Sequence, residues 1–284
     1  MSTSSPHNNH NNHNDQTIAF IGGGNMASAI IGGLLKRGMA ASRIQIVEPF
    51  EEQRIKLRQQ FGIEADFGTS QHLASAAMVI WAVKPQTFKE AALQTRFHTK
   101  NALHLSVAAG IRSESIAHWL GTERVVRSMP NTPALVGQGM TALFARKAAT
   151  PADRQNAERV IATTGDYVWL DDEVHLDSVT AISGSGPAYV FYFIEAMIEA
   201  GVDMGLTRQQ AHKLAVGTFV GSSALAKASD DPPEILRARV TSKGGTTYAA
   251  ITSMEQDRVK TLFMRAMHAA KQRAREMGDE FGTA

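Results

Sequence analysis

The chain has 284 residues, of which 43% are hydrophobic and 20% charged, with a formal net charge of +2 and no cysteine. This length allows one or two domains with a sizeable core. The mixed charges argue against a nucleic-acid-binding protein, and no apolar run approaches the ~20 residues of a membrane span. Without cysteine there is no disulfide, thiolate metal site or cysteine nucleophile, and without a signal-peptide pattern at the start we expect a cytoplasmic protein.

Residues 1–15 (MSTSSPHNNHNNHND) differ from the rest of the chain, because they are rich in Asn, His and Ser and almost without apolar groups. Such a composition predicts a disordered tail. His7, His10 and His13 recur at every third position. Weak metal binding by these histidines is the alternative. We predict no functional metal site elsewhere.

A glycine-rich turn follows the first apolar run. GGGNMA at 22–27 is a GxGxxA pattern that opens a helix-like segment. Gly22 permits a tight turn, Gly24 leaves room for a pyrophosphate, and Ala27 lets the helix pack close to the strand. The N–H groups at the helix start then face the anion. The residues predicted to bind a nicotinamide or flavin dinucleotide here are Ile21, Gly22, Gly23, Gly24, Asn25 and Met26.

Strands and helices alternate through the first half. Apolar runs predict strands at 17–21, 44–47, 78–83, 103–107, 124–128, 142–144 and 167–170. Helices are predicted at 25–35, 51–60 and 114–120, and another begins with Thr150 as N-cap and Pro151 at its first position. This alternation indicates an α/β fold, with a Rossmann-like doubly wound sheet that we expect over 16–172.

Only helices are expected from residue 173 onward. They are predicted at 187–204, after Thr207, from 231–234 onward, and at 259–277. The first carries AYVFYFI at 188–194, so it is apolar nearly all round and should be buried on every side. A helical segment of about 110 residues can hardly bury it alone, so a second subunit is expected to cover it. We therefore expect residues 173–284 to form an all-helical dimerisation domain.

Loops after two predicted strands carry candidate cofactor contacts, because ligands bind at the carboxyl ends of parallel strands. The first loop contains Ala82, Val83, Lys84 and Pro85, and the second contains Val107, Ala108 and Ala109 followed by Gly110. Lys84 is expected near a phosphate or ribose, with a solvated lysine as the alternative. The small residues of the second loop leave room for a nicotinamide ring. MPNTP at 129–133 follows a third strand and predicts a rigid turn.

Two glycine-containing segments lie in the helical half. In TSKGGTT at 241–247, two glycines before a helix start expose N–H groups in a nest that favours a carboxylate or phosphate. Thr246 or Thr247 is expected to cap that helix or to offer its hydroxyl to a ligand. The alternative is an ordinary interhelical turn. SGSGP at 183–187 allows a close approach to a ligand or simply packs two helices.

Together these motifs resemble the pyrroline-5-carboxylate reductase family. FIGGGNMA (20–27), AVKP (82–85), SVAAG (106–110), RSMPNTPALVGQGMT (127–141), SGSGPAYVF (183–191) and GGTT (244–247) follow in that family's order and spacing. The resemblance covers about residues 17–280. β-Hydroxyacid dehydrogenases also resemble the N-terminal part, but their catalytic lysine would fall at Val190, which counts against them.

The resemblance implies hydride transfer from NAD(P)H to the imine carbon of 1-pyrroline-5-carboxylate, giving L-proline in the last step of proline biosynthesis. It places the substrate carboxylate on Lys243, Gly244, Gly245, Thr246 and Thr247. The Thr247 hydroxyl would be the catalytic group, as hydrogen-bond partner of the imine nitrogen and candidate proton source. The nicotinamide would rest between the loop at 108–110 and the helical domain of a partner, in a homodimer or larger homo-oligomer.

Two positions bear on how this chain differs from that pattern. Lys243 stands where the family commonly has proline, so a positive charge is added beside the expected carboxylate and a stiffening ring is lost. Glu48 lies at the end of the second predicted strand, 24 residues after Gly24, and an acidic residue at about this distance suits the ribose hydroxyls of NAD and repels a 2′-phosphate. NADPH or NADH is the expected cofactor, with a lean towards NADH. In the alternative, Glu48 is solvated and Arg54 reaches a 2′-phosphate.

Two other functions stay open at this point. One is the reduction of another small cyclic imine acid, because ring size leaves no readable trace in the sequence. The other is an NAD(P)-binding sensor without turnover. The GGTT loop argues against the sensor, which needs no second anion site beside the nicotinamide.

Overall fold

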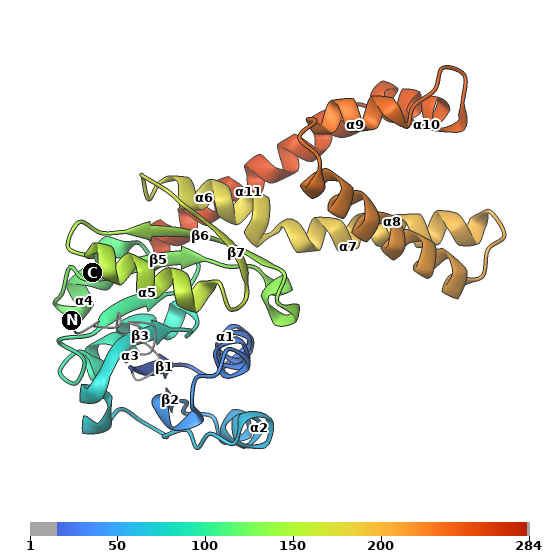
Figure 1. The fold of residues 1–284 in the computed structure, drawn as a ribbon. Helices are drawn as coiled ribbons and strands as arrows, with labels where there is room; N and C mark the ends of the chain where they lie inside the picture. Colours follow the sequence, from blue (N-terminus) through green and yellow to red (C-terminus); the bar gives the residue numbers. More distant parts are fainter. Residues whose placement is uncertain (1–15, 283–284) are drawn as a thin grey trace, which may run out of the picture. The chain divides into compact units, whose positions relative to one another are not determined.

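The computed structural model describes residues 16–282, and Figure 1 shows its elements; the tail predicted over 1–15 lies outside this range. The strands are β1 (Thr17–Ile21), β2 (Ile44–Val47), β3 (Ala76–Trp81), β4 (Leu103–Ser106), β5 (Val125–Met129), β6 (Gly139–Ala145) and β7 (Gly165–Trp169). The helices are α1 (Asn25–Lys36), α2 (Glu51–Phe61), α3 (Pro85–Thr95), α4 (Ser113–Leu120), α5 (Pro151–Ile161), α6 (His175–Val179), α7 (Gly186–Asp203), α8 (Arg208–Ala228), α9 (Pro233–Arg239), α10 (Thr246–Gln256) and α11 (Val259–Phe281).

One sheet of seven strands has the order β2-β1-β3-β4-β5-β6-β7. All neighbouring strands are parallel except β5 and β6. The α/β fold and the positions of all seven predicted strands are thereby confirmed. β3 ends at Trp81, before the predicted end at residue 83, so Ala82 and Val83 already belong to the loop that follows.

Helices cover both faces of the sheet. Apolar residues of α1, α2 and α5 pack with Phe20, Ile80 and Leu105 in one buried cluster. Residues of α3 and α4 pack with Val79 and Trp81 in a second. Because parallel strands covered on both faces must be apolar on both, β3 reads as a continuous apolar run. α3 was not predicted, although Pro85 at its first position is a helix-start signal.

The chain divides into two compact units. The sheet unit comprises the described residues up to 184 together with those from 271 onward, and the helical unit comprises residues 185–270. The strands end before residue 173, where the helical domain was predicted to begin, but residues 173–184 pack within the sheet unit. The last part of α11 belongs to that unit as well.

The helical unit buries few apolar side chains within one chain. α7 and α8 pack closely enough that a Cβ on Gly201 would lie 2.8 Å from the Ala211 Cβ. Ile198, Ala211 and Ala215 form its buried cluster. Phe191 and Tyr192 stay 64% and 69% exposed, so a single chain does not bury α7 on all sides. The predicted capping of α8 by Thr207 is confirmed, with Gln210 completing a reciprocal cap.

Candidate functional site

The glycine-rich turn lies between β1 and α1. Gly22 has φ +93°, and a Cβ there would lie 2.7 Å from the Ala82 carbonyl oxygen, so only glycine fits. The Gly22 N–H donates to the Val47 oxygen (2.8 Å), which ties the turn to the end of β2. At Gly24, the N-cap of α1, an added Cβ would meet nothing within 4 Å. The turn therefore keeps open space where a pyrophosphate needs it, and its residues fit a dinucleotide.

Glu48 lies beside this turn, just beyond β2. Its side chain is 5% exposed. Its Oε2 accepts from the Gly23 N–H (2.8 Å) and its Oε1 from the Phe50 N–H (2.9 Å). Gln53 donates to the Gly23 oxygen (2.6 Å) from the first turns of α2. Glu48 is thus not the solvated loop residue of the alternative prediction, because its carboxylate is directed at the phosphate turn.

The loops after β3 and β4 meet the turn at the same sheet edge. The Ala82 N–H donates to the Ile21 oxygen (2.8 Å), and the Val107 N–H donates to the Trp81 oxygen (3.0 Å). Lys84 is exposed and occupies the N-cap position of α3, where its side chain makes no capping hydrogen bond. Ala108 is buried and Ala109 partly buried. The structure therefore brings the predicted cofactor residues of β1, β2, β3 and β4 together along one edge.

Gly110 closes the loop after β4 against the C-terminal helix. It has φ +70°, and a Cβ there would lie 2.9 Å from the Met277 Cβ of α11. A larger residue would displace either this loop or the helix end. No local pattern links positions 110 and 277, so the support of the predicted nicotinamide loop by α11 was not predicted.

The MPNTP turn is fastened to the SGSGP segment by Asn131. Its Nδ2 donates to the Ser183 oxygen (3.0 Å), and its Oδ1 accepts from the Met140 N–H (2.9 Å). Residues Thr180–Gly184 form a π-helical turn, a feature frequent near functional sites. A Cβ on Gly184 would lie 2.5 Å from the Met129 Cε. Sequence reasoning predicted a rigid turn and a close approach but missed this pairing of the two motifs.

The predicted substrate loop lies in the helical unit. Gly244 has φ +76°, and Gly245 is the N-cap of α10, so neither Thr246 nor Thr247 caps the helix as one alternative expected. These threonines are its first two residues, where backbone N–H groups have no partner within the helix. Lys243, Gly244 and Thr246 are exposed, and Gly245 and Thr247 are half-buried. The loop thus combines free N–H groups, two hydroxyls and a cation, a set suited to a carboxylate.

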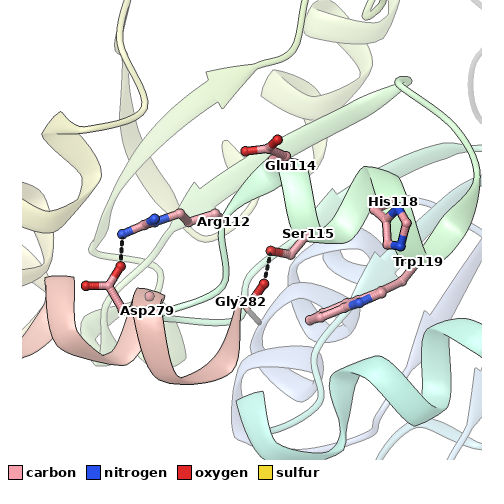
Figure 2. A pocket seen from close by; sticks show the side chains of 8 residues that line it. Arg112, Glu114, Ser115, His118, Trp119, Asp279 and Gly282 are labelled. Carbon is pink, nitrogen blue, oxygen red and sulfur yellow. Dashed lines mark hydrogen bonds and ion pairs between the residues drawn. The ribbon is translucent and has the colours of Figure 1, made fainter. Parts of the chain in front are cut away.

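A separate cavity of about 480 Å³ lies in the sheet unit, and none of the predicted site residues lines it. It is lined by Arg112, Glu114, Ser115, His118, Trp119, Gly278, Asp279 and Gly282. Figure 2 shows Arg112 directed at Asp279 and the Ser115 hydroxyl at the Gly282 oxygen, to which it donates at 2.9 Å. These contacts hold the end of α11 against α4.

Within residues 16–282, no group of three or more His, Asp or Glu side chains is arranged to hold a metal ion. The histidines at 7, 10 and 13 lie outside that range. Among the described helices, none is long and apolar enough to cross a membrane.

Comparison with known proteins places these features in one family. The family model described as pyrroline-5-carboxylate reductase dimerisation matches residues 173–277. A second, described as NADP oxidoreductase coenzyme F420-dependent, matches residues 17–110. The pyrroline-5-carboxylate reductase of Pseudomonas aeruginosa is 42% identical over 267 residues, which is 93% of this chain and 98% of that protein.

Two solved structures extend the likeness to the fold. A pyrroline-5-carboxylate reductase from Coxiella burnetii has a TM-score of 0.86 and 34% identity, with 92% of this chain and 98% of that chain covered. The Plasmodium falciparum pyrroline carboxylate reductase, solved with NADP bound, has a TM-score of 0.83 and 28% identity, with 93% and 99% covered. Sequence and fold therefore agree over nearly the whole chain.

Proposed function

The chain belongs to the pyrroline-5-carboxylate reductase family, and on that premise we propose which of its residues bind the cofactor and which bind the substrate. It is an NAD(P)-dependent oxidoreductase that converts 1-pyrroline-5-carboxylate to L-proline. The bound cofactor supplies the hydride, and the protein supplies position and electrostatics. The observation that carries the assignment is the open phosphate turn at Gly24 in a chain similar to these reductases over nearly its whole length.

We propose that the dinucleotide lies along the edge formed by the turn and the loops after β2, β3 and β4. The N–H groups of Gly24, Asn25 and Met26 at the start of α1 receive the pyrophosphate. Lys84 adds a cation at this edge, with Ala82, Val83 and Pro85 lining the same side. The loop at 107–109 (Val107, Ala108 and Ala109) leaves the nicotinamide room to approach the backbone. Ile21 and Gly23 also contact the dinucleotide, from the end of β1 and from the turn.

For the substrate, we propose that the nest at 243–247 binds the carboxylate. The N–H groups at the start of α10, where Thr246 and Thr247 are the first two residues, and the Lys243 charge match an anion. The Thr247 hydroxyl is then the hydrogen-bond partner of the ring nitrogen and the candidate group through which the imine is protonated before hydride arrives. Addition of hydride to the ring carbon of the protonated imine gives the neutral amine of L-proline. A protonated cyclic imine is already a good hydride acceptor, so no strong base is required.

The dimerisation family model over 173–277 implies a homo-oligomer. We propose that it is a homodimer or a larger assembly built through the helical segment that begins at residue 173. The exposed apolar side chains of α7 and α8 support this, because so few of the helical unit's side chains are buried in one chain. The nicotinamide would then face the substrate loop of a partner subunit.

We propose that Glu48 tilts cofactor preference towards NADH. Its buried carboxylate lies against the phosphate turn, where it accepts ribose hydroxyls and repels a 2′-phosphate. Replacing Glu48 by Ser should raise kcat/KM with NADPH relative to NADH by about tenfold or more. Glu48→Gln, which removes the charge but keeps an acceptor for the Gly23 N–H, should move the ratio in the same direction. An unchanged ratio in both variants would show that Glu48 does not set the preference.

The direct test follows absorbance at 340 nm while the purified protein meets 1-pyrroline-5-carboxylate with NADH or NADPH in separate reactions. We expect rapid substrate-dependent loss of absorbance. Comparison with the six-membered analogue, 1-piperideine-2-carboxylate, separates the proposed substrate from other cyclic imine acids. No loss with either cofactor, in protein shown to be folded and oligomeric, would contradict the assignment.

A further inference from the structure

We propose that Phe67, Arg54 and Phe50 form the platform that holds the adenine ring of the dinucleotide. This inference rests on the proposed function and deepens it, since nothing in the predicted site contacts the base. The three side chains lie around the carboxyl end of β2, the strand that carries Glu48 at its end.

Backbone hydrogen bonds place Phe67 beside Glu48, the residue that we propose to bind the adenosine ribose. The Glu48 N–H donates to the Asp66 oxygen (2.9 Å), and the Asp66 N–H donates to the Ile46 oxygen (2.8 Å). Asp66 thus continues the sheet next to β2, and Phe67 follows it directly. Phe50 is held beside the Glu48 carboxylate, because the Phe50 N–H donates a hydrogen bond to Glu48 Oε1.

Arg54 is oriented by two backbone oxygens. Its NH1 donates to the Glu48 oxygen (3.0 Å) and the Pro49 oxygen (2.8 Å). Its Cζ lies 5.6 Å from the centre of the Phe67 ring, within cation–π range. The guanidinium is therefore fixed beside the ring, and both groups offer flat surfaces for stacking.

Phe50 and Phe67 are each 73% exposed, so neither ring contributes to the core. Phe50 is connected to the phosphate turn because the Glu48 carboxylate accepts hydrogen bonds from both the Gly23 N–H and the Phe50 N–H. Phe67 is connected to it through the backbone bonds of Asp66 with Ile46 and Glu48. In a dinucleotide fold, the acid after the second strand meets the adenosine ribose. The base attached to that ribose is the planar group that lies nearest to these rings.

The chain offers a matched control in Phe97. This ring is 63% exposed and also lies under an arginine, with Arg96 Cζ 4.7 Å from its centre. It follows α3, which begins at the carboxyl edge of the sheet and runs back along it, so Phe97 lies at the opposite edge. A general effect of removing an exposed phenyl ring will appear equally at both positions.

The test measures Kd by calorimetry for ADP, NADH and reduced nicotinamide mononucleotide, using the full chain. Phe67→Ala should weaken ADP and NADH by about 5- to 30-fold, the range for a lost base-stacking contact. The mononucleotide should bind as before, Phe67→Trp should restore ADP affinity, and Phe97→Ala should change nothing. Unchanged ADP affinity in Phe67→Ala, or an equal loss in Phe97→Ala, would overturn the platform alone. Failure of the unmodified protein to bind NADH would overturn the proposed function and the platform with it.

Discussion

At the scale of single residues, Thr247 is the group that we place at the imine nitrogen. It is the second residue of α10 and only half-buried, so removing its hydroxyl leaves the helix intact. Thr247→Ala should lower kcat by about 10- to 1000-fold, the range for a lost positioning or proton-transfer group. Steady-state kinetics with saturating cofactor measure this. Thr247→Ser keeps the hydroxyl and should retain most of the rate, and unchanged kinetics in Thr247→Ala would remove the residue from the mechanism.

Two glycines of the phosphate turn should respond differently to the same substitution. At Gly24 the backbone has φ −68° and an added Cβ meets open space, so Gly24→Val should fold normally and lose cofactor binding. At Gly22 the Cβ would collide with the Ala82 oxygen at φ +93°, so Gly22→Val should destabilise the fold itself. Thermal unfolding and NADH titration separate the two effects. Retained NADH affinity in Gly24→Val would contradict the phosphate-turn assignment.

His104 ties stability to pH. Burial lowers its pKa from 6.5 to about 4, a hydrogen bond with the Thr99 backbone opposes this, and the Arg124 charge adds to it. The Trp81 indole N–H donates to His104 Nδ1 (3.1 Å), so this nitrogen carries no proton. Between these two pKa values the unfolded chain binds more protons than the folded one, so stability falls as pH drops through this window.

The expected loss between pH 7 and pH 5 is about 2 kcal/mol of unfolding free energy. Urea unfolding at the two pH values measures it. Asp153 does not interfere, because its pKa is lowered from 3.8; burial raises it, but hydrogen bonds from Arg124 and Thr150 outweigh that effect. His104→Gln should flatten the dependence, and an equal slope in this variant would assign it to other groups.

Local pattern predicts part of this residue-level picture. The spacing from the turn identified Glu48, and the glycine pattern identified Gly22 and Gly24, because both signals lie in short stretches of sequence. Asn131 and its bond to Ser183 had no such signal, since the partners lie 52 positions apart. A polar side chain that pairs across the fold looks like any other polar residue in a loop.

At the scale of elements, Glu173 anchors the segment that leads into the helical half. Its Oε1 accepts from the Ser113 N–H (2.6 Å) and from Arg127 NH1 (2.9 Å). The Arg127 side chain is 5% exposed, so Glu173→Gln would leave a buried cation without its counter-charge. We expect a loss of about 3 kcal/mol, measured by urea unfolding. Replacing Arg127 by Met in the same chain should recover much of this loss, and no recovery would contradict the role of charge.

The starts of α5 and α8 were predictable from the local sequence, because each is marked by a capping threonine. At the start of α5, the Thr150 hydroxyl accepts a hydrogen bond from the Asp153 N–H, and the Asp153 carboxylate accepts one from the Thr150 N–H. This capping signal is contained in four consecutive residues. The direction of β6 was not predictable in the same way. It pairs with β5 antiparallel, and this depends on how the MPNTP turn reverses the chain rather than on the apolar content of the strand.

For the whole molecule, the sequence pattern predicts an α/β part followed by an all-helical part. It does not predict which residues pack into the sheet unit and which into the helical unit. The periodicity of α11 identifies a helix and says nothing of which core each part joins. The structure assigns its last residues to the sheet unit, where Met277 supports Gly110 and Asp279 pairs with Arg112. Such contacts join distant positions, which a local pattern cannot encode.

Assembly is the property of the whole molecule that the helical unit predicts. Phe191 and Tyr192 of α7 expose most of their surface in a single chain, on a unit whose buried cluster consists of three residues. A charge placed there must be desolvated in any interface that covers α7. Phe191→Glu should therefore raise the dissociation constant of the oligomer by about 100-fold or more.

Sedimentation velocity over a dilution series measures this constant, and the 340 nm assay on the same samples tests whether activity falls with dissociation. We expect both to fall together, since the nicotinamide is proposed to face a partner's substrate loop. Phe97→Glu places the same charge on a ring that is 63% exposed in the sheet unit and should leave assembly intact. A Phe191→Glu protein that stays assembled would show that α7 is not covered by a second copy, and an active monomer would place the whole site within one chain.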